Sequence, residues 1–242
     1  MLTSLKNEKV KYLNKLRNKK YILENKEYVV EGFNLVTEAI KNNVAKEIIL
    51  LEKEVFDTDL PITYVTKEIL KKISRLDTAP NIMAVCKIKE QKENVGNKII
   101  ILDNIGDPGN AGTIVRSALA FGIDTIVLSN SSVSIYNDKF IRATEGAYFK
   151  ANIFSKDLEE FIKDLKKKDF LIIGTALNNN TISLKNLEKS EKYALVFGNE
   201  GTGVSEGVLN LCDKVVKIDI KDSVESLNVS IAAAIMMYYM EG

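Results

Sequence analysis

Three segments rich in glycine and asparagine carry most of the side chains that are suited to chemistry. They are residues 103–116, 197–203 and 225–230. Each lies near the end of a short apolar run typical of a β-strand, and the first and third begin runs typical of helices. Glycine lets the backbone approach a ligand closely, while asparagine, glutamate and arginine supply amide, carboxylate and guanidinium groups. These segments therefore predict a binding or catalytic site.

The first segment offers Asn110 as a helix N-cap and Arg116 in the second turn of a helix expected over residues 111–121. Arg116 stands among apolar neighbours, which makes it a candidate functional cation. An arginine on a core helix can also simply extend to solvent. The glycines of this segment lack the G-x-G-x-x-G spacing of a dinucleotide-binding loop, and the matching acidic residue is missing. A nicotinamide-dependent oxidoreductase is therefore disfavoured.

The second segment holds Asn199 and Glu200 between glycines, which predicts a tight loop with an ionisable group at the sheet edge. The alternative is a turn with a solvated glutamate. In the third segment, Ser223 or Ser226 is expected to cap the closing helix, with Asn228 in its first turns. A helix N-terminus favours a carboxylate or phosphate, although capping alone also explains these residues.

Composition narrows the chemistry further. The 242 residues are 45% hydrophobic and 28% charged, as in ordinary globular proteins, and no apolar run approaches the ~18 residues of a membrane span. The N-terminus lacks an apolar signal core, so a cytoplasmic location is expected. Histidine is absent, which removes the commonest general base and metal ligand. Cys86 and Cys212 are isolated and are predicted to be buried thiols, so no metal site is expected.

Positive charge is concentrated at the N-terminus. Residues 1–24 contain seven basic and two acidic residues, a net charge of +5, whereas the whole chain has a net charge of only +1. Such an arm suits a polyanion such as RNA. A solvated helix face is the alternative explanation.

The periodicity predicts an α/β protein in two parts. A small α/β module, residues 1–88, begins with a helix over 5–20 and is followed by a polar linker, residues 89–97. In residues 98–242, strands that are apolar on both faces alternate with helices, which indicates a parallel sheet covered on both sides. Ligands bind beyond the carboxyl ends of such strands, where all three segments fall. The expected strands are residues 98–102, 125–128, 170–174, 193–197 and 215–218.

Taken together, the segments resemble the SpoU (TrmH) family of RNA 2'-O-ribose methyltransferases, in the SPOUT superfamily. The resemblance rests on Asn110-x-Gly112 with Arg116, then residues 198–203, then residues 226–230, in the family's order. Residues 142–147 and 29–33 match two further family segments, the second within a substrate-binding module. Thr144 replaces the usual serine, and residues 218–220 replace a common Ile-Pro-Met.

The resemblance implies a fold and a cofactor. The family fold is a parallel sheet whose C-terminal end passes through a loop, forming a trefoil knot that periodicity alone would not suggest. S-adenosylmethionine would bind within the knot, and a methyl group would pass directly to a ribose 2'-hydroxyl, so the protein mainly positions the two partners. The implied cofactor-binding residues are Thr175, Ala176, Gly198, Asn199, Gly201, Ile218, Leu227 and Asn228.

The implied catalytic residues are Arg116, Asn110, Glu200 and Asn228. A guanidinium stays protonated and is a poor base, so we expect Arg116 to hold an RNA phosphate and to make the hydroxyl more acidic. Family members are homodimers with sites completed across the interface, and the apolar closing helix suits burial on two sides. Structured ribosomal RNA is the expected substrate. Transfer RNA, or a non-catalytic RNA-binding role on the same fold, remains an alternative.

Overall fold

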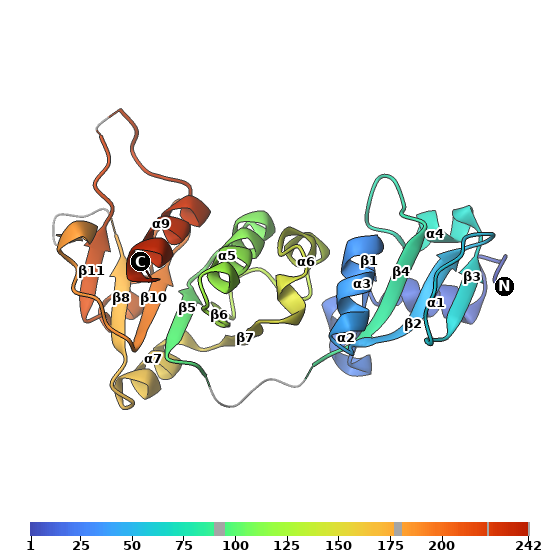
Figure 1. Ribbon diagram of the computed structural model, residues 1–242, viewed down its shortest axis with the longest axis horizontal. Coiled ribbons are helices and arrows are strands. Elements are labelled where there is room, and N and C mark those ends of the chain that lie inside the picture. Colours follow the sequence, from blue (N-terminus) through green and yellow to red (C-terminus); the bar gives the residue numbers. More distant parts are fainter. Residues whose placement is uncertain (90–94, 177–180, 222, 242) are drawn as a thin grey trace. The chain divides into compact units, whose positions relative to one another are not determined.

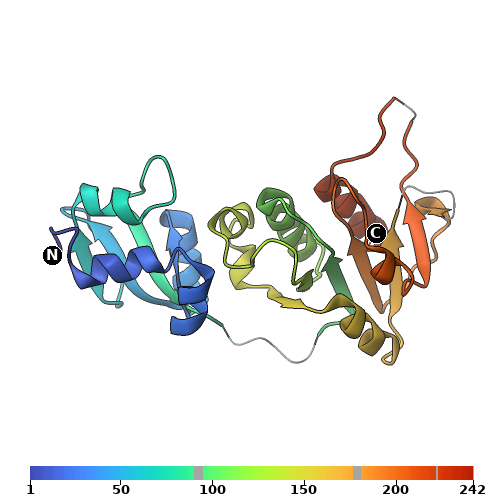
Figure 2. The same cartoon turned by 180° about the vertical axis from the view of Figure 1, so that it is seen from behind.

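The chain forms two compact units, Met1–Glu90 and Gln91–Gly242, each with its own sheet. The expected linker, residues 89–97, spans the division, but its residues 90–94 lie outside the described part of the chain. The computed structural model (Figures 1 and 2) describes residues 1–89, 95–176, 181–221 and 223–241.

The N-terminal unit is a four-stranded sheet covered by helices. Its strand order is β1-β4-β2-β3, with β4 antiparallel to β1 and β2, and β3 parallel to β2. Val10 and Leu13 of α1 pack on Ile69 and Ile73 of α4 in one buried cluster. The elements are α1 (Glu8–Lys15), α2 (Lys19–Asn25), β1 (Glu27–Glu31), α3 (Phe33–Lys41), β2 (Ala45–Leu51), β3 (Ile62–Val65), α4 (Lys67–Ile73) and β4 (Ile82–Lys87).

The single helix expected over residues 5–20 is wrong, because the structure has two helices there. The first, α1, ends at Lys15, and Asn18 caps α2 by accepting a hydrogen bond from the backbone N–H of Lys20 at 2.9 Å. Asparagine competes with helical hydrogen bonding by bonding to nearby backbone groups, so it favours a cap over a helix interior. The apolar periodicity continues across the break and does not reveal it.

The C-terminal unit contains a seven-stranded sheet in the order β7-β6-β5-β10-β8-β11-β9, and every pairing in it is parallel. This confirms the expected parallel sheet. Helices α7 and α8 cover the face that carries Ile99 and Ile101, and α5 and α9 lie side by side (Figure 1). The strands are β5 (Lys98–Leu102), β6 (Thr125–Ser129), β7 (Asn152–Lys156), β8 (Leu171–Thr175), β9 (Ile182–Ser183), β10 (Tyr193–Phe197) and β11 (Lys214–Lys217).

Two strands at the edges of this sheet, β7 and β9, are absent from the sequence prediction. β7 has only two apolar residues, Ile153 and Phe154, and β9 has two residues in all, so neither shows the continuous apolar run of the central strands. The helical elements are α5 (Pro108–Ala120), α6 (Asp138–Ala143), the 3-10 turns Ala147–Phe149 and Leu184–Asn186, α7 (Leu158–Lys166), α8 (Glu206–Leu209) and α9 (Val229–Glu241).

Helix α5 begins three residues earlier than expected, which corrects two predictions. Its N-cap is Asp107, whose carboxylate accepts from the backbone N–H of Asn110 at 2.7 Å, and Pro108 occupies the first turn. Proline suits that position because it lacks the N–H that would be unpaired there. Asn110 is therefore inside the helix and is not its cap. Arg116 consequently lies in the third turn and not in the second.

The closing helix α9 is apolar on most sides. Ala233, Met236, Met237 and Met240 are buried, whereas Ile231, Ile235 and Tyr238 are exposed. At 13 residues α9 is short, and no helix in the described residues is both long and apolar enough to cross a membrane.

Candidate active site at the carboxyl ends of the parallel strands

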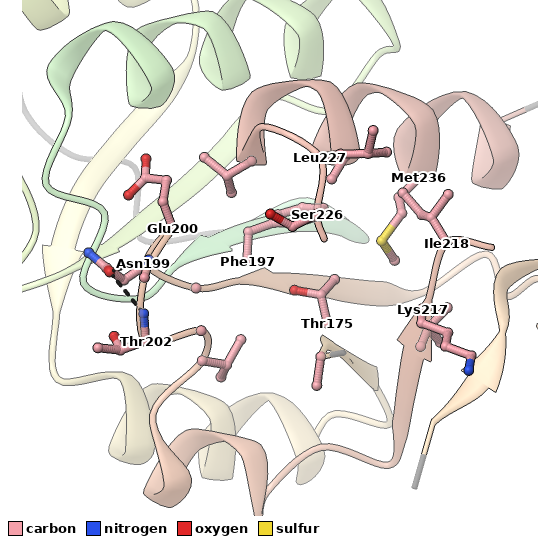
Figure 3. Close-up of a pocket in the computed structure, with 18 of the residues that line it drawn as sticks. Thr175, Phe197, Asn199, Glu200, Thr202, Lys217, Ile218, Ser226, Leu227 and Met236 are labelled. Carbon is pink, nitrogen blue, oxygen red and sulfur yellow. Dashed lines mark hydrogen bonds between the residues drawn. The ribbon is translucent and has the colours of Figure 1, made fainter. Parts of the chain in front are cut away.

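A cavity of about 410 Å³ opens at the carboxyl ends of β10, β8 and β11 (Figure 3). Four stretches of chain surround it: residues 175–176, residues 197–204, residues 216–220 and residues 226–229. Apolar side chains of Leu209 and of α9, including Met236, close it. The volume falls within the range of roughly 300–1,000 Å³ for small-ligand sites. The expected position of the site, beyond the strand ends, is where the cavity lies.

Most of the residues expected to bind a cofactor surround this cavity. Asn228 does not line it. The expected residues that do are Thr175, Ala176, Gly198, Asn199, Gly201, Ile218 and Leu227. Apart from Glu200, the other wall residues were not among the expected site residues, although Phe197, Thr202, Gly203 and Ser226 lie in segments identified from the sequence. These other wall residues are Phe197, Thr202, Gly203, Val204, Leu209, Val216, Lys217, Ile220, Ser226, Val229, Ala232 and Met236.

Side chains of residues 218–220, which replace the common Ile-Pro-Met, alternate between the cavity and the opposite side. Ile218 and Ile220 line the cavity, whereas Asp219 does not. The Asp219 carboxylate instead accepts a hydrogen bond from the Ser183 hydroxyl. The unusual aspartate is thus directed at a neighbouring segment, and the cavity wall at this point is aliphatic.

The loop of residues 198–204 is held tightly by its own atoms. Backbone bonds join Asn199 and Gly203 in both directions, at 3.0 and 2.8 Å. A Cβ atom on Gly198 would lie 2.1 Å from the backbone of Gly203 and Val204, so only glycine fits there. The crowding at Gly198 comes from its own loop.

A chain of side-chain hydrogen bonds links the three sequence segments. Asn228 Oδ1 accepts from the backbone N–H groups of Ser230 and Ile231, at 2.9 and 3.4 Å, which makes Asn228 the cap of α9. Its Nδ2 donates to Asn110 Oδ1 at 3.0 Å, and Asn110 Nδ2 donates to Glu200 Oε1 at 2.7 Å. We name this the amide chain. Ser223 and Ser226 were the expected caps, and that prediction is wrong.

The amide chain has a fixed direction. Because Asn228 Oδ1 already faces the N–H groups of α9, Nδ2 is the atom that remains for Asn110. Asn110 must then receive with its oxygen and donate with its nitrogen, so Glu200 receives a hydrogen bond at one carboxylate oxygen. An ionised carboxylate is an acceptor only. The arrangement therefore suits Glu200 as a proton acceptor, with its second oxygen still available.

Arg116 stands apart from this group. Its side chain is exposed on α5, it does not line the cavity, and among the described residues it has no hydrogen bond or ion pair. By helix geometry it lies about 9 Å along α5 from Asn110 and about 120° around the axis. The structure thus brings together Asn110, Glu200 and Asn228, and leaves Arg116 on the outer surface.

Other ionisable groups near the site have structural roles. The pKa of Asp107 is lowered by its hydrogen bond from the backbone of Asn110 and by Lys139. Burial raises the pKa of the Cys212 thiol to about 12, although Cys212 is only half-buried and not buried as expected. No cluster of metal-ligating residues occurs in the described ranges.

Comparison with known proteins gives a consistent result. Residues 97–238 match the model of the SpoU rRNA Methylase family, and residues 7–84 match an MRM3-like substrate binding domain. The chain is 32% identical to 23S rRNA (guanosine(2553)-2'-O)-methyltransferase RlmP of Bacillus subtilis, over 100% of this chain and 99% of the relative.

Solved structures agree with this match. A putative RNA methyltransferase of the TrmH family from Porphyromonas gingivalis has a TM-score of 0.88 at 28% identity and covers 98% of each chain. An AdoMet-bound rRNA methyltransferase from Sinorhizobium meliloti has a TM-score of 0.86 at 24% identity, over 99% of this chain and 96% of its own, and shares the fold. The chain therefore belongs to the SpoU rRNA methylase family of S-adenosylmethionine-dependent RNA methyltransferases.

Proposed function

We propose that the protein transfers a methyl group from S-adenosylmethionine to a ribose 2'-hydroxyl of structured RNA, with ribosomal RNA as the favoured substrate. The observation that carries the proposal is the amide chain, which ends on Glu200 at the wall of the cavity. Family membership overturns the alternative of a nicotinamide oxidoreductase.

The cavity suits the cofactor. Apolar walls such as Leu209, Ile218 and Met236 fit the adenine, and backbone groups at Ala176 and Leu227 can bond to its edge. When bound, the cofactor supplies a methyl group on a sulfonium that is already a good leaving group. The protein then has to hold the ribose in line and accept the hydroxyl proton. Glu200 has the chemistry for the second task.

In this proposal Asn110 and Asn228 orient Glu200, and Arg116 holds an RNA phosphate. A guanidinium presents a rigid fork of donors that matches a phosphate, and it remains charged. Arg116 is exposed and has no hydrogen bond or ion pair within the described part of the chain, which supports that role. A positive charge beside the ribose also makes the 2'-hydroxyl more acidic, which eases proton transfer to Glu200.

We further propose a homodimer that forms through α9. Ile231, Ile235 and Tyr238 are 52%, 38% and 69% exposed and are spaced four and three residues apart, so they form one apolar stripe. The stripe adjoins α5, where Phe121 packs edge-on against Tyr238. A partner seated on the stripe would lie beside the C-terminal end of α5, and we propose that α5 of one protomer, which carries Arg116, completes the site of the other.

The C-terminal segment is proposed to form the trefoil knot of the family. In support, the chain leaves β11 beyond β8 and returns to pack α9 against α5. On its way it lines the same cavity as residues 197–204. Stretching single molecules from both ends tests this, because a tightened knot leaves the chain measurably shorter than ~3.5 Å per residue.

The N-terminal unit is proposed to bind the RNA. Ion pairs neutralise three lysines of the basic arm, because Lys9 contacts Glu47, Lys11 contacts Glu8 and Lys20 contacts Glu24. Three cations at the corner between α1 and α2 form no ion pair in the described residues. We name them the basic corner: Lys15, Arg17 and Lys19.

The basic corner also contains an aromatic surface, since the Lys15 ammonium lies 5.6 Å from the centre of the Tyr21 ring. Cations beside an aromatic ring suit a phosphate backbone with an unpaired base. The Bacillus relative is named as a 23S rRNA methyltransferase, which favours ribosomal RNA and hence a cytoplasmic location.

The decisive experiment is to map 2'-O-methylated nucleotides in RNA from cells with and without the protein, and to repeat the reaction with purified protein and labelled cofactor. We expect one ribosomal site to disappear without the protein and to be restored by the wild type but not by Glu200→Gln. Loss of a methylated site in transfer RNA would show that transfer RNA is the substrate. Unchanged methylation in both RNA classes, with no transfer in vitro, would favour the non-catalytic alternative.

A further inference from the structure

The loop of residues 198–204 must keep one backbone conformation if it is to form part of the cavity wall. It contains three glycines, so many backbone conformations are open to it, yet it supplies consecutive residues of the cavity wall. Inside the loop, backbone bonds join Asn199 and Gly203, and Asn199 Oδ1 accepts from the backbone N–H groups of Gly201 and Thr202 at 2.9 and 3.2 Å. These bonds all depend on Asn199, so contacts at the two ends of the loop decide where the loop lies in the cavity wall before a cofactor binds.

One end is held by Asp103, which directly follows β5. Its side chain is only 3% exposed, and Oδ2 accepts a hydrogen bond from the backbone N–H of Ser205 at 2.7 Å. Oδ1 accepts from Asn104 Nδ2 at 3.0 Å. No ion pair involves Asp103 within the described ranges, so amide donors alone satisfy this buried carboxylate. A carboxylate is needed because both donors require an acceptor.

The other end is held by Asn104. Its carbonyl oxygen accepts from Asn199 Nδ2 at 3.0 Å, while its own N–H donates to the Ser129 hydroxyl at 3.0 Å. Asn104 has a φ of +56°, in the left-handed region that asparagine adopts more readily than most residues. That conformation directs the carbonyl at the loop. The Ser131 hydroxyl also donates to the Asn104 side chain, so Asn104 is anchored by the end of β6 and by the loop that follows it.

We propose that Asp103 and Asn104 are positioning residues that hold the cavity loop in its cofactor-binding conformation. The inference rests on the proposed function for the identity of the cofactor. A loop that is ordered in advance does not lose conformational freedom on binding, so the two residues should act on cofactor affinity more than on the methyl-transfer step. Neither residue lines the cavity, and neither needs to touch substrate.

The first test uses Asp103→Asn. An amide has one oxygen, so it cannot receive both Ser205 N–H and Asn104 Nδ2, and a donor then faces a donor. We expect the Kd for S-adenosylmethionine, measured by calorimetry, to rise about tenfold, with kcat at saturating cofactor within about threefold of the wild type. The control is Asp157→Asn, which also replaces a carboxylate that accepts a backbone N–H, at the cap of α7 away from the cavity.

Hydrogen exchange in the cofactor-free protein gives an independent readout. Amides of residues 201–204 should exchange faster in Asp103→Asn, while those of β10 keep wild-type protection. If the wild type failed to bind S-adenosylmethionine, the proposed function would fail, but loop exchange would still test the positioning role. A folded Asp103→Asn with wild-type loop exchange and wild-type affinity would overturn the inference.

A second pair covers the case in which Asp103→Asn does not fold. Asn104→Gly keeps the carbonyl and tolerates a positive φ, whereas Asn104→Ala makes that φ unfavourable. We expect Asn104→Gly to bind cofactor within about threefold of the wild type and Asn104→Ala to bind at least about threefold more weakly than Asn104→Gly. Equal affinities in the two variants would contradict a role for the Asn104 carbonyl.

Discussion

The two units of the chain present polar groups in opposite ways. In the N-terminal unit, the basic corner consists of exposed charges at the end of α1, in the following turn and at the start of α2: Lys15, Arg17 and Lys19. In the C-terminal unit, the amide chain and the loop of residues 198–204 are fixed by hydrogen bonds to helix ends and strand ends. Exposed charges bind a polyanion without strict geometry, whereas methyl transfer requires fixed positions. Under the proposed function, the N-terminal unit supplies geometry-independent affinity for RNA, and the C-terminal unit supplies the fixed positions that the chemistry needs.

The largest expected effect is that of Glu200→Gln, which removes the proton acceptor but keeps the size. We expect kcat for methyl transfer to fall about 100-fold or more, with little change in RNA affinity, because general base catalysis contributes roughly 10²–10⁴-fold. Transfer of labelled methyl groups measures it. Glu206→Gln, an exposed site on α8, is the matched control. Near-normal turnover in Glu200→Gln would show that Glu200 is not the proton acceptor.

Ile235→Glu should have the next largest effect, because it places a charge within the apolar stripe of α9. We expect a monomer with greatly reduced activity, since the partner's α5 no longer completes the site. Sedimentation and turnover are measured together. Ile182→Glu is a close control, because Ile182 is 37% exposed and Ile235 is 38% exposed. A dimer that persists in Ile235→Glu would show that the interface lies on another surface.

Asn228→Asp tests the direction of the amide chain. Aspartate caps a helix as well as asparagine does, so stability should change little, whereas Asn228→Ala should cost about 1 kcal/mol. The aspartate has no donor for Asn110 Oδ1, so we expect kcat to fall on the order of tenfold, the scale of one hydrogen bond. Thermal unfolding and turnover separate the two effects. Equal turnover in the wild type and Asn228→Asp would show that the amide chain does not orient Glu200.

The smallest effect on turnover is expected from replacing the three residues of the basic corner with glutamine. The slope of log K for RNA against log salt should become less steep by roughly 2–3, at about 0.7–0.9 for each lost phosphate contact, whereas cofactor affinity stays unchanged. Filter binding at several salt concentrations measures the slope. Lys67, Lys71 and Lys72 of α4, also exposed, provide a matched triple. Equal slopes for both triples would place the RNA on another surface.

The central strands and the location of the site could be predicted from the sequence. Apolar runs identified the central strands, and their parallel arrangement put residues 103–116, 197–203 and 225–230 at one edge. Helix ends were harder, because Asp107, Asn110, Ser226 and Asn228 are all plausible caps by type. Which one caps depends on the direction from which the chain enters the helix. That direction is set by packing and not by local preference.

The sequence by itself determined the family and the parallel sheet, and it identified eight of the twenty residues around the cavity, because the family motifs place glycine, asparagine and glutamate at the strand ends. Only the tertiary structure showed that Asn228, Asn110 and Glu200 form one directed chain, and that Asp103 and Asn104 hold the loop. Those contacts join residues about a hundred positions apart along the chain. Hydrogen-bond direction depends on which atoms are already engaged, and only the folded chain decides that.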